Sequence, residues 1–348
     1  MSVVPDDDLY FEKQLAKGAF GSVWKGKIKS KNMIVAIKVL SFSESLDISD
    51  PDDLAQFEKG IKEIQNEINL LSTLRHRNIV QFMGASLKPP NFNILMEYVE
   101  GGSLYDLLHK KRKSLKIARK RMSKKGGDLR ENSGAKIAGG RAREEDGNQD
   151  ETEEVECVLP WKHKVNMLLQ IASGIMFIHA QSVIHRDLKS HNILLGGSIP
   201  DAIIPKICDF GLSKTRGVNM SQKVMTQAVG TPLWMAPEVV LGNTYSYSCD
   251  VFSFSIMICE MMTETLPYLD MVEPHMQGNI HFKVATQADF RPRIPARVVD
   301  DPENFEAKSL VELMKQGWSQ DPAARPSSKE VYERLKAIAS VVNALDPN

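Results

Sequence analysis

One stretch of this chain, Ile184–Leu195, constrains it more than any other because charged and polar residues stand between short apolar runs. The apolar flanks predict short buried strands, and the polar middle predicts a loop held between them. Within that loop, Asp187 could accept a proton, Lys189 could neutralise an anion, and Asn192 could offer an oxygen to a metal. A purely structural segment needs none of these groups, so the stretch indicates a reactive site.

Composition sets the broad class of the protein. The 348 residues suffice for two lobes with buried cores, and 25% charged with 42% hydrophobic residues is typical of a soluble globular protein. The formal net charge of +0 gives no general attraction to nucleic acid or to an anionic membrane. Four cysteines without a C-x-x-C pair argue against a disulfide framework or a zinc site and favour a reducing, cytoplasmic setting.

Neither the N-terminus nor the longest apolar run has the pattern of a leader peptide or of a membrane span. The N-terminus, Met1–Asp8, contains three aspartates and no apolar core, so no signal peptide is predicted. The longest apolar run, Val251–Met262, is interrupted by two serines and a glutamate and is too short to span a bilayer.

Residues 9–40 predict strands, with a glycine-containing turn at Leu15–Val23. Gly18 and Gly21 would let the backbone approach a phosphate closely, although ordinary hairpin glycines explain them equally well. Ala16 stands where a G-x-G-x-x-G loop would have its first glycine.

The next strand, Ile34–Leu40, is apolar except for Lys38. Alternation places Ala36 and Lys38 on one face, and a lysine in such a run needs an anionic partner unless its ammonium reaches solvent. A helix predicted from Asp50-Pro51 to Leu74 could supply that partner. Its candidate acids are Glu58, Glu63 and Glu67.

Two further strands are predicted at 79–84 and 93–99, and the second runs into Glu100-Gly101-Gly102. The glycines suggest a flexible linker between lobes, whose backbone could bond an adenine edge while Met96 limits the depth of the pocket. A strand followed by a simple loop is the alternative, and composition does not separate the two.

Residues 110–156 differ in character from the rest of the chain. Lys110–Lys125 holds ten lysines and arginines, Glu144–Glu156 holds eight acids, and no aromatic residue occurs between 110 and 156. Such a segment predicts a disordered insert whose oppositely charged halves could contact each other or a partner. A nuclear-import or nucleic-acid role for the basic half is weighed against a solvated insert without sequence-specific function, which is the favoured interpretation.

Further motifs follow the opening stretch. Asp209, in Cys208-Asp209-Phe210-Gly211, would lie near Asn192, and the two side chains offer oxygens suited to magnesium, although Asp-Phe-Gly alone is a common turn. Residues 212–229 read as a surface segment rich in Ser, Thr, Lys and Gln. As buried charges that need partners, Glu238 is expected to pair with Arg325, and Asp250 is expected to hold the backbone of the opening loop.

In order, from about Leu9 to Leu345, these motifs resemble the eukaryotic protein kinase domain. The wording His185–Leu195 and Gly230–Glu238 is most similar to the tyrosine kinase-like group of Ser/Thr kinases, which includes Raf and mixed-lineage kinases. The resemblance implies an α+β, bilobal fold in which residues 9–98 form a small antiparallel β-sheet lobe with one helix. Residues 99–345 would form a larger, mainly helical lobe with the insert at about 110–156.

The resemblance also implies roles for individual residues. Lys38 would contact the α- and β-phosphates of ATP and pair with Glu67, Asp187 would take the proton of the acceptor hydroxyl, and Lys189 would steady the γ-phosphate. Asn192 and Asp209 would hold Mg²⁺. The implied nucleotide pocket is formed by Leu15, Ala16, Gly18, Gly21, Val23, Ala36, Lys38, Met96, Glu97, Val99 and Leu194. An apolar column linking the lobes would be formed by Leu71, Phe82, His185 and Phe210.

By resemblance, the expected activity is ATP-dependent phosphorylation of Ser/Thr hydroxyls of protein substrates in intracellular signalling. Arg186 beside Asp187 suggests control by phosphorylation of the following loop, with Ser221 and Thr226 favoured over Ser213 and Thr215. A catalytically silent scaffold is disfavoured because every expected catalytic residue is present, and dual specificity stays open. Cytoplasmic location is expected, with nuclear entry possible through residues 110–125.

Overall fold

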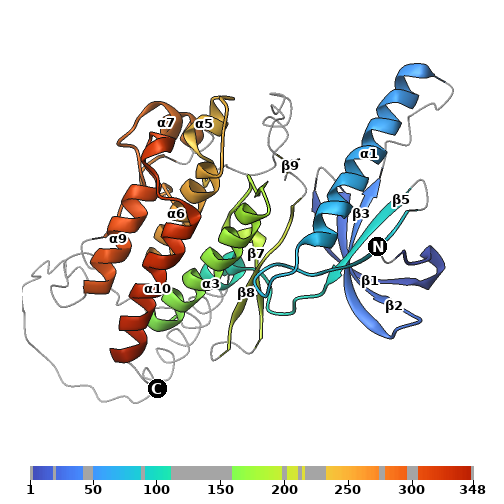
Figure 1. Ribbon diagram of the computed structural model, residues 1–348, viewed down its shortest axis with the longest axis horizontal. Helices are drawn as coiled ribbons and strands as arrows, with labels where there is room; N and C mark the ends of the chain where they lie inside the picture. The colour runs from blue at the N-terminus through green and yellow to red at the C-terminus, as the bar shows by residue number, and fades with distance from the viewer. Residues whose placement is uncertain are drawn as a thin grey trace, which may run out of the picture.

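The computed structural model describes most of the chain in segments. These are residues 3–18, 21–41, 50–87, 91–110, 159–197, 202–210, 214–215, 233–273, 279–295 and 305–345. The predictions about the insert, and those about Ser221 and Thr226, lie outside the described residues. Figure 1 shows a smaller lobe, made of a sheet and the long helix α1, beside a larger lobe of helices.

The small lobe is built on one antiparallel sheet with the strand order β1-β2-β3-β5-β4. Its strands are β1 (Leu9–Gly18), β2 (Gly21–Ile28), β3 (Met33–Ser41), β4 (Phe82–Ser86) and β5 (Asn91–Glu97). Among the described residues of this lobe, α1 (Pro51–Thr73) is the one α-helix. Alternation along β3 buries Val35 and Ile37 in an apolar cluster on one face, so Ala36 and Lys38 belong to the other face, as the sequence predicted.

The chain before β1 extends the sheet, a feature that the sequence analysis did not assign. Val3 makes a parallel bridge with Ala85 of β4, and Val4 is 4% exposed within the apolar cluster of the sheet. The carboxylate of Asp6 accepts hydrogen bonds from Ser86 and Asn93. The segment thus covers an edge strand that would otherwise leave backbone groups unpaired.

Strand β4 begins at Phe82, three residues later than the sequence predicted. Residues 78–80 pair instead with the large lobe, because Val80 N donates to Ile207 O at 2.9 Å and Ile207 N donates to Asn78 O at 2.8 Å. These two backbone hydrogen bonds join the small lobe to the large lobe.

The large lobe contains six helices among the described residues, arranged around α6. They are α3 (Trp161–Ala180), α5 (Pro237–Val240), α6 (Ser248–Thr263), α7 (Ile280–Thr286), α9 (Phe305–Gly317) and α10 (Ser328–Leu345). Every residue of α6 from Cys249 to Thr263 is buried, which explains why this helix is apolar on all sides. Within the described segments, no helix is both long and apolar enough to cross a bilayer.

Two short β-pairs lie where the large lobe meets the small one. They consist of β6 (Val183–Ile184) with β9 (Lys214–Thr215), and β7 (Ile193–Gly196) with β8 (Ile204–Ile207). The predicted catalytic loop therefore runs between β6 and β7, as its apolar flanks indicated. The predicted α+β fold with a sheet lobe and a helical lobe is confirmed.

Candidate active site

Lys38 of β3 is the charge that joins the small lobe to the predicted metal ligand. Its Nζ lies 2.9 Å from Glu67 Oε1 and 3.4 Å from Asp209 Oδ1. Burial alone would lower the pKa of Lys38, but the carboxylates of Glu67 and Asp209 outweigh it and raise the pKa above its ordinary value. The lysine is therefore a fixed cation, and the predicted Lys38–Glu67 pair is present.

The sheet face that carries Lys38 also carries the predicted nucleotide residues. Register places Ala16 opposite Val23, Val23 opposite Lys38, and Ala36 opposite Met96. Directly opposed residues of an antiparallel pair lie on the same face. These side chains therefore form one surface, turned away from the apolar cluster of Val35 and Ile37, whereas Leu15 is 44% exposed.

Gly18 and Gly21 close the hairpin between β1 and β2 by pairing with each other. Gly21 has φ +131°, and a Cβ placed on it would lie 2.0 Å from Val39 O. Glycine is required there by conformation and by space. The glycine turn is thus built into the sheet, and its phosphate-binding role stays a prediction.

Backbone hydrogen bonds to β7 hold the linker after β5 in place. Gly101 N donates to Leu195 O and Leu195 N donates to Gly102 O, both at 2.9 Å, while Leu194 makes a bridge with Ser103. These bonds place Leu194 beside the linker, and its part in a nucleotide pocket stays a prediction.

The Glu97 side chain has a different role from the one that a nucleotide contact would require. Its Oε1 accepts from Gln81 N and from Lys206 Nζ, both at 2.8 Å. Glu97 N also donates to Gln81 O at 2.9 Å. Any bond to an adenine edge is therefore expected from Glu97 O and from the backbone of the half-buried Val99.

The catalytic-loop side chains converge on Asp187. Lys189 Nζ lies 2.7 Å from Asp187 Oδ2, and Asn192 Nδ2 donates to Asp187 O at 2.7 Å and to Oδ2 at 3.0 Å. The three residues are therefore a hydrogen-bonded unit, and their separate roles in the reaction stay predictions. Asn192 commits its amide nitrogen to Asp187, which leaves its oxygen as the atom that could meet a metal.

His185 links the loop to the strand that ends at Asp209. Asp187 N donates to His185 Nδ1 at 3.3 Å, so Nδ1 accepts and the proton of a neutral ring is on Nε2, which donates to Cys208 O at 3.0 Å. The His185 and Phe210 rings lie 4.9 Å apart. Leu71 and Phe210 share the same core, with Phe82 packed against it, as the predicted column required.

Asp250 of α6 anchors the start of the loop. Its Oδ2 accepts from His185 N at 2.8 Å and faces His179 Nε2 at 2.9 Å, and its Oδ1 accepts from Arg186 N at 2.8 Å. Burial alone would raise the pKa of Asp250, but the bond from His179 and the nearby His185 outweigh it and hold the pKa below its ordinary value. The prediction that Asp250 holds this backbone is confirmed.

This anchor coincides with backbone strain. Arg186 has φ 71° and Asp209 has φ 62°, both in the left-handed region that non-glycine residues rarely adopt. Such conformations persist when surrounding groups fix them, and they cluster at functional sites. Asp250 fixes the first through a direct hydrogen bond.

A second buried carboxylate of α6, Glu260, anchors the end of the loop. Its Oε1 accepts from Ser190 Oγ at 2.7 Å and contacts His109 Nε2 at 2.8 Å, and its Oε2 accepts from Trp234 Nε1 at 2.9 Å. In the sequence, Glu260 stands out only as an interruption of an apolar run. A fully buried charge inside an apolar helix was the available signal.

The predicted Glu238–Arg325 pair is also present and is bidentate. Arg325 Nη1 lies 2.7 Å from Glu238 Oε1, and Nη2 lies 2.9 Å from Oε2. The guanidinium packs over the Phe252 ring at 5.0 Å. This pair ties the segment before α10 to α5 and stabilises the lobe that carries the loop.

The proposed metal ligands fit magnesium by chemistry. The carboxylate of Asp209 is 53% exposed. Burial alone would raise its pKa, but Lys38 and His185 hold that pKa below its ordinary value, so the group is ionised. An ionised carboxylate and an amide oxygen suit Mg²⁺ when substrate phosphates complete the ligand set. Across the described residues, no group of three or more His, Cys, Asp or Glu forms a self-sufficient metal site.

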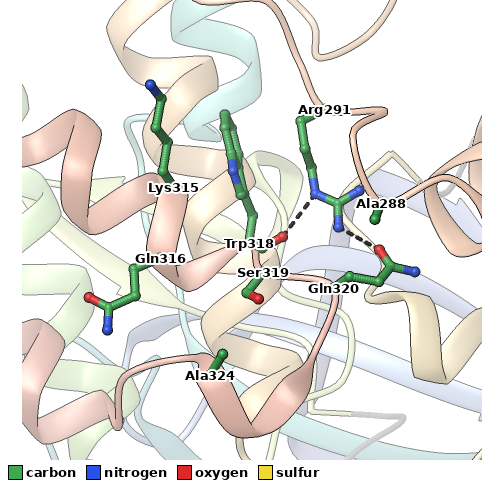
Figure 2. Close-up of a pocket in the computed structure, with 8 residues that line it drawn as sticks. All are labelled: Ala288, Arg291, Lys315, Gln316, Trp318, Ser319, Gln320 and Ala324. Atoms are coloured by element: carbon green, nitrogen blue, oxygen red, sulfur yellow. Dashed lines mark hydrogen bonds between the residues drawn. The ribbon is translucent and has the colours of Figure 1, made fainter.

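A separate hollow of about 400 Å³ lies in the helical lobe, between Arg291 and the Trp318–Gln320 segment (Figure 2). Arg291 Nε donates to Trp318 O at 2.8 Å and Nη2 donates to Gln320 Oε1 at 2.7 Å. The arginine is thus used to hold that segment in place. None of the predicted nucleotide or catalytic residues lines this hollow.

Comparison with known families agrees with this geometry. Residues 9–335 match the family described as protein tyrosine and serine/threonine kinase, and the chain belongs to that family. A probable serine/threonine-protein kinase of Dictyostelium discoideum is 32% identical over 95% of this chain. The serine/threonine-protein kinases STY46 and STY17 of Arabidopsis thaliana are 32% and 29% identical over 96% and 95% of it.

The match covers only part of each relative. The chain spans 28% of the length of the Dictyostelium protein, 45% of STY46 and 44% of STY17. What the chain shares with these proteins is therefore the kinase domain.

Proposed function

We propose that this chain transfers the γ-phosphoryl group of ATP to serine or threonine hydroxyls of protein substrates. The observation that carries the proposal is the charge chain Glu67–Lys38–Asp209 next to the unit of Asp187, Lys189 and Asn192. The two groups are linked where Cys208 N, beside Asp209, donates to Asn192 O at 3.0 Å. Phosphoryl transfer is mostly positioning and charge neutralisation, and the two groups supply both.

On the nucleotide side, Lys38 is held as a cation between two carboxylates, ready to meet the α- and β-phosphates. Ala36 and Met96 flank the surface on which an adenine ring would lie, and the linker backbone would bond its edge. Mg²⁺, held through Asn192 and Asp209, would neutralise part of the charge of the phosphates.

On the acceptor side, Asp187 would orient the substrate hydroxyl and accept its proton. Asn192 holds the Asp187 carboxylate in place. Lys189 contacts the same carboxylate, so its ammonium would meet the phosphoryl group during transfer. The choice of Ser/Thr as acceptor is supported by Lys189 within the loop motif and by the printed names of the relatives.

We also propose control by phosphorylation after Gly211, with Thr226 and Ser221 as the favoured positions. Support comes from the sequence of that segment and from Arg186, which is buried next to Asp187 in the sequence. The Arg186 guanidinium lies 4.8 Å from the centre of the Tyr245 ring. A phosphate brought to this cation would gain a charge-assisted bond and could order the segment.

The test compares wild type with Asp187→Asn, using the matched surface substitution Asp289→Asn as a control. With Mg-ATP and a mixed Ser/Thr peptide library, Asp187→Asn should lower kcat about 10²- to 10⁴-fold because the general base is lost. Nucleotide binding, followed by thermal shift, should persist because Lys38 and Glu67 are untouched.

Phosphoamino-acid analysis of the products identifies the acceptor. Equal turnover of wild type and Asp187→Asn, or absence of transfer by wild type that binds Mg-ATP, would overturn the proposal and favour a scaffold. Phosphotyrosine alone would overturn the Ser/Thr assignment.

A further inference from the structure

His191, inside the catalytic loop, belongs to a stack of rings that the proposed reaction does not use. Its ring lies 3.7 Å from the Tyr105 ring at an interplanar angle of 22°, and 5.7 Å from Trp234 at 84°. Tyr105 in turn contacts His109 at 4.8 Å. We refer to Tyr105, His109, His191 and Trp234 as the ring platform.

The ring platform is assembled from three separate segments. Tyr105 and His109 come from the chain after the interlobe linker, where a π-helical turn spans Asp106–Lys110. His191 comes from the catalytic loop, and Trp234 comes from the segment before α5. Nothing in the local sequence of any one segment requires the others, so their meeting is a property of the fold.

The buried carboxylate of Glu260 holds two rings of the platform in place. Its carboxylate binds His109 and Trp234 directly, and it binds Ser190, the neighbour of His191. The carboxylate has 0% side-chain exposure. The rings are therefore held rigidly, whereas His191 remains exposed at the surface.

The ring platform is close to the reacting groups. His191 lies between Lys189 and Asn192 in sequence, and both of these side chains contact the Asp187 carboxylate. A peptide that presents its hydroxyl to Asp187 would run past this exposed imidazole within a few residues of the acceptor.

Charge around the ring platform does not favour a basic side chain of the substrate. Asp106 is paired with Lys110 at 2.6 Å, and both oxygens of Glu260 already have donors. Among the described residues of the platform, the carboxylates are thus committed, and His191 is the exposed ring, while Trp234 is buried.

We propose that the ring platform binds an aromatic side chain of the protein substrate, located within four residues of the phosphorylated hydroxyl, with His191 as its exposed contact. Stacked rings attract other rings by stacking or edge-to-face contact and bury their apolar surface. The inference rests on the proposed kinase activity and adds a substrate class to it.

The test is a positional-scanning peptide library with a fixed Ser/Thr acceptor, phosphorylated by wild type, by three variants of His191 and by one control variant. Wild type should favour Phe, Tyr or Trp about three- to tenfold at one position, the effect of one aromatic pair. His191→Ala should lose that preference at that position, His191→Phe should keep it, and His191→Glu should shift it toward Arg and Lys. His163→Ala, which removes a half-buried imidazole from α3, should leave the profile unchanged.

The variants separate a specific contact from a general loss of structure. Thermal unfolding should be close to wild type for the three His191 variants, because His191 is exposed. If wild type phosphorylates peptides without an aromatic preference, or if His191→Ala keeps the wild-type profile, the inference is wrong while the proposed function stands. If wild type transfers no phosphate to any peptide, the proposed function fails, and the inference fails with it.

Discussion

Replacing Asp250 by Asn tests the idea that the helical core holds the catalytic loop in a strained conformation. The substitution keeps shape and volume but replaces one acceptor oxygen with an amide that donates. Asp250 accepts from His185 N and Arg186 N through different oxygens, and His179 shares one of them. Whichever way the new amide turns, at least one of these buried donors faces another donor.

The magnitude follows from these contacts. A hydrogen bond to a charged group contributes about 1.5–3 kcal/mol, and leaving a buried donor unsatisfied costs about 1–3 kcal/mol. The two overlap, so we expect about 3 kcal/mol of lost stability. At about 2.1 cal/mol/K per residue, the unfolding entropy of this 348-residue chain is about 0.7 kcal/mol/K, so a loss of about 3 kcal/mol should lower Tm by about 4 °C.

Activity should fall as well, because release of Arg186 from φ 71° moves the neighbouring Asp187. A misplacement of about 1 Å can lower the rate about 10²-fold. The KM for ATP should change little, since the Lys38–Glu67 pair lies in the other lobe.

The assay combines thermal unfolding at pH 7.5 with steady-state kinetics well below Tm. The control is Glu333→Gln, a substitution of the same kind at an exposed position. The pKa of Asp250 is held below its ordinary value, so its stabilising effect is present above pH 3.8 and is lost only as the pH falls below that. The comparison at pH 7.5 therefore measures the full effect. A Tm within 2 °C of wild type together with an unchanged kcat would refute the argument.

Two other predictions concern the scaffold and regulation. Glu238→Gln leaves the Arg325 cation buried without a counter-charge, although Ser319 O and Ser248 O still accept from it. The free energy of unfolding, measured in urea, should therefore fall by about 3 kcal/mol. A decrease of less than about 1 kcal/mol would contradict the role of the pair. Thr226→Ala should lower the activity of protein phosphorylated on the loop; mutant activity that equals that of phosphorylated wild type, measured in the same kinase assay, would exclude this site.

Local patterns in the sequence predicted several parts of the fold. Alternation predicted the opposite faces of β3, and helical periodicity with an Asp-Pro start predicted α1. A lysine in an apolar strand also predicted that an anion must lie nearby. Which glutamate that was could not be derived from the helix alone, because three acids lay on it, and the resemblance to kinases selected Glu67.

Long-range partners were not accessible in the same way. The bond from Glu97 to Lys206 joins residues 109 apart, and the pairing of Val3 with β4 depends on a sheet edge that only the folded chain presents. Glu260 was visible as a charge in an apolar helix, but its three donors come from three distant segments. Sequence reasoning identifies a buried charge that needs partners, and the fold decides which groups supply them.

The two carboxylates of α6 give that principle a functional reading. Asp250 and Glu260 lie ten residues apart, about 15 Å along the helix, and bind the catalytic loop at Arg186 and at Ser190. A loop held at one point could rotate, whereas a loop held at two points of a buried helix can keep a strained residue next to Asp187. Burying two charges in an apolar helix is costly unless they are well paired. Here the pairing is with the catalytic loop itself, so that cost is offset by the same bonds that position the reacting groups.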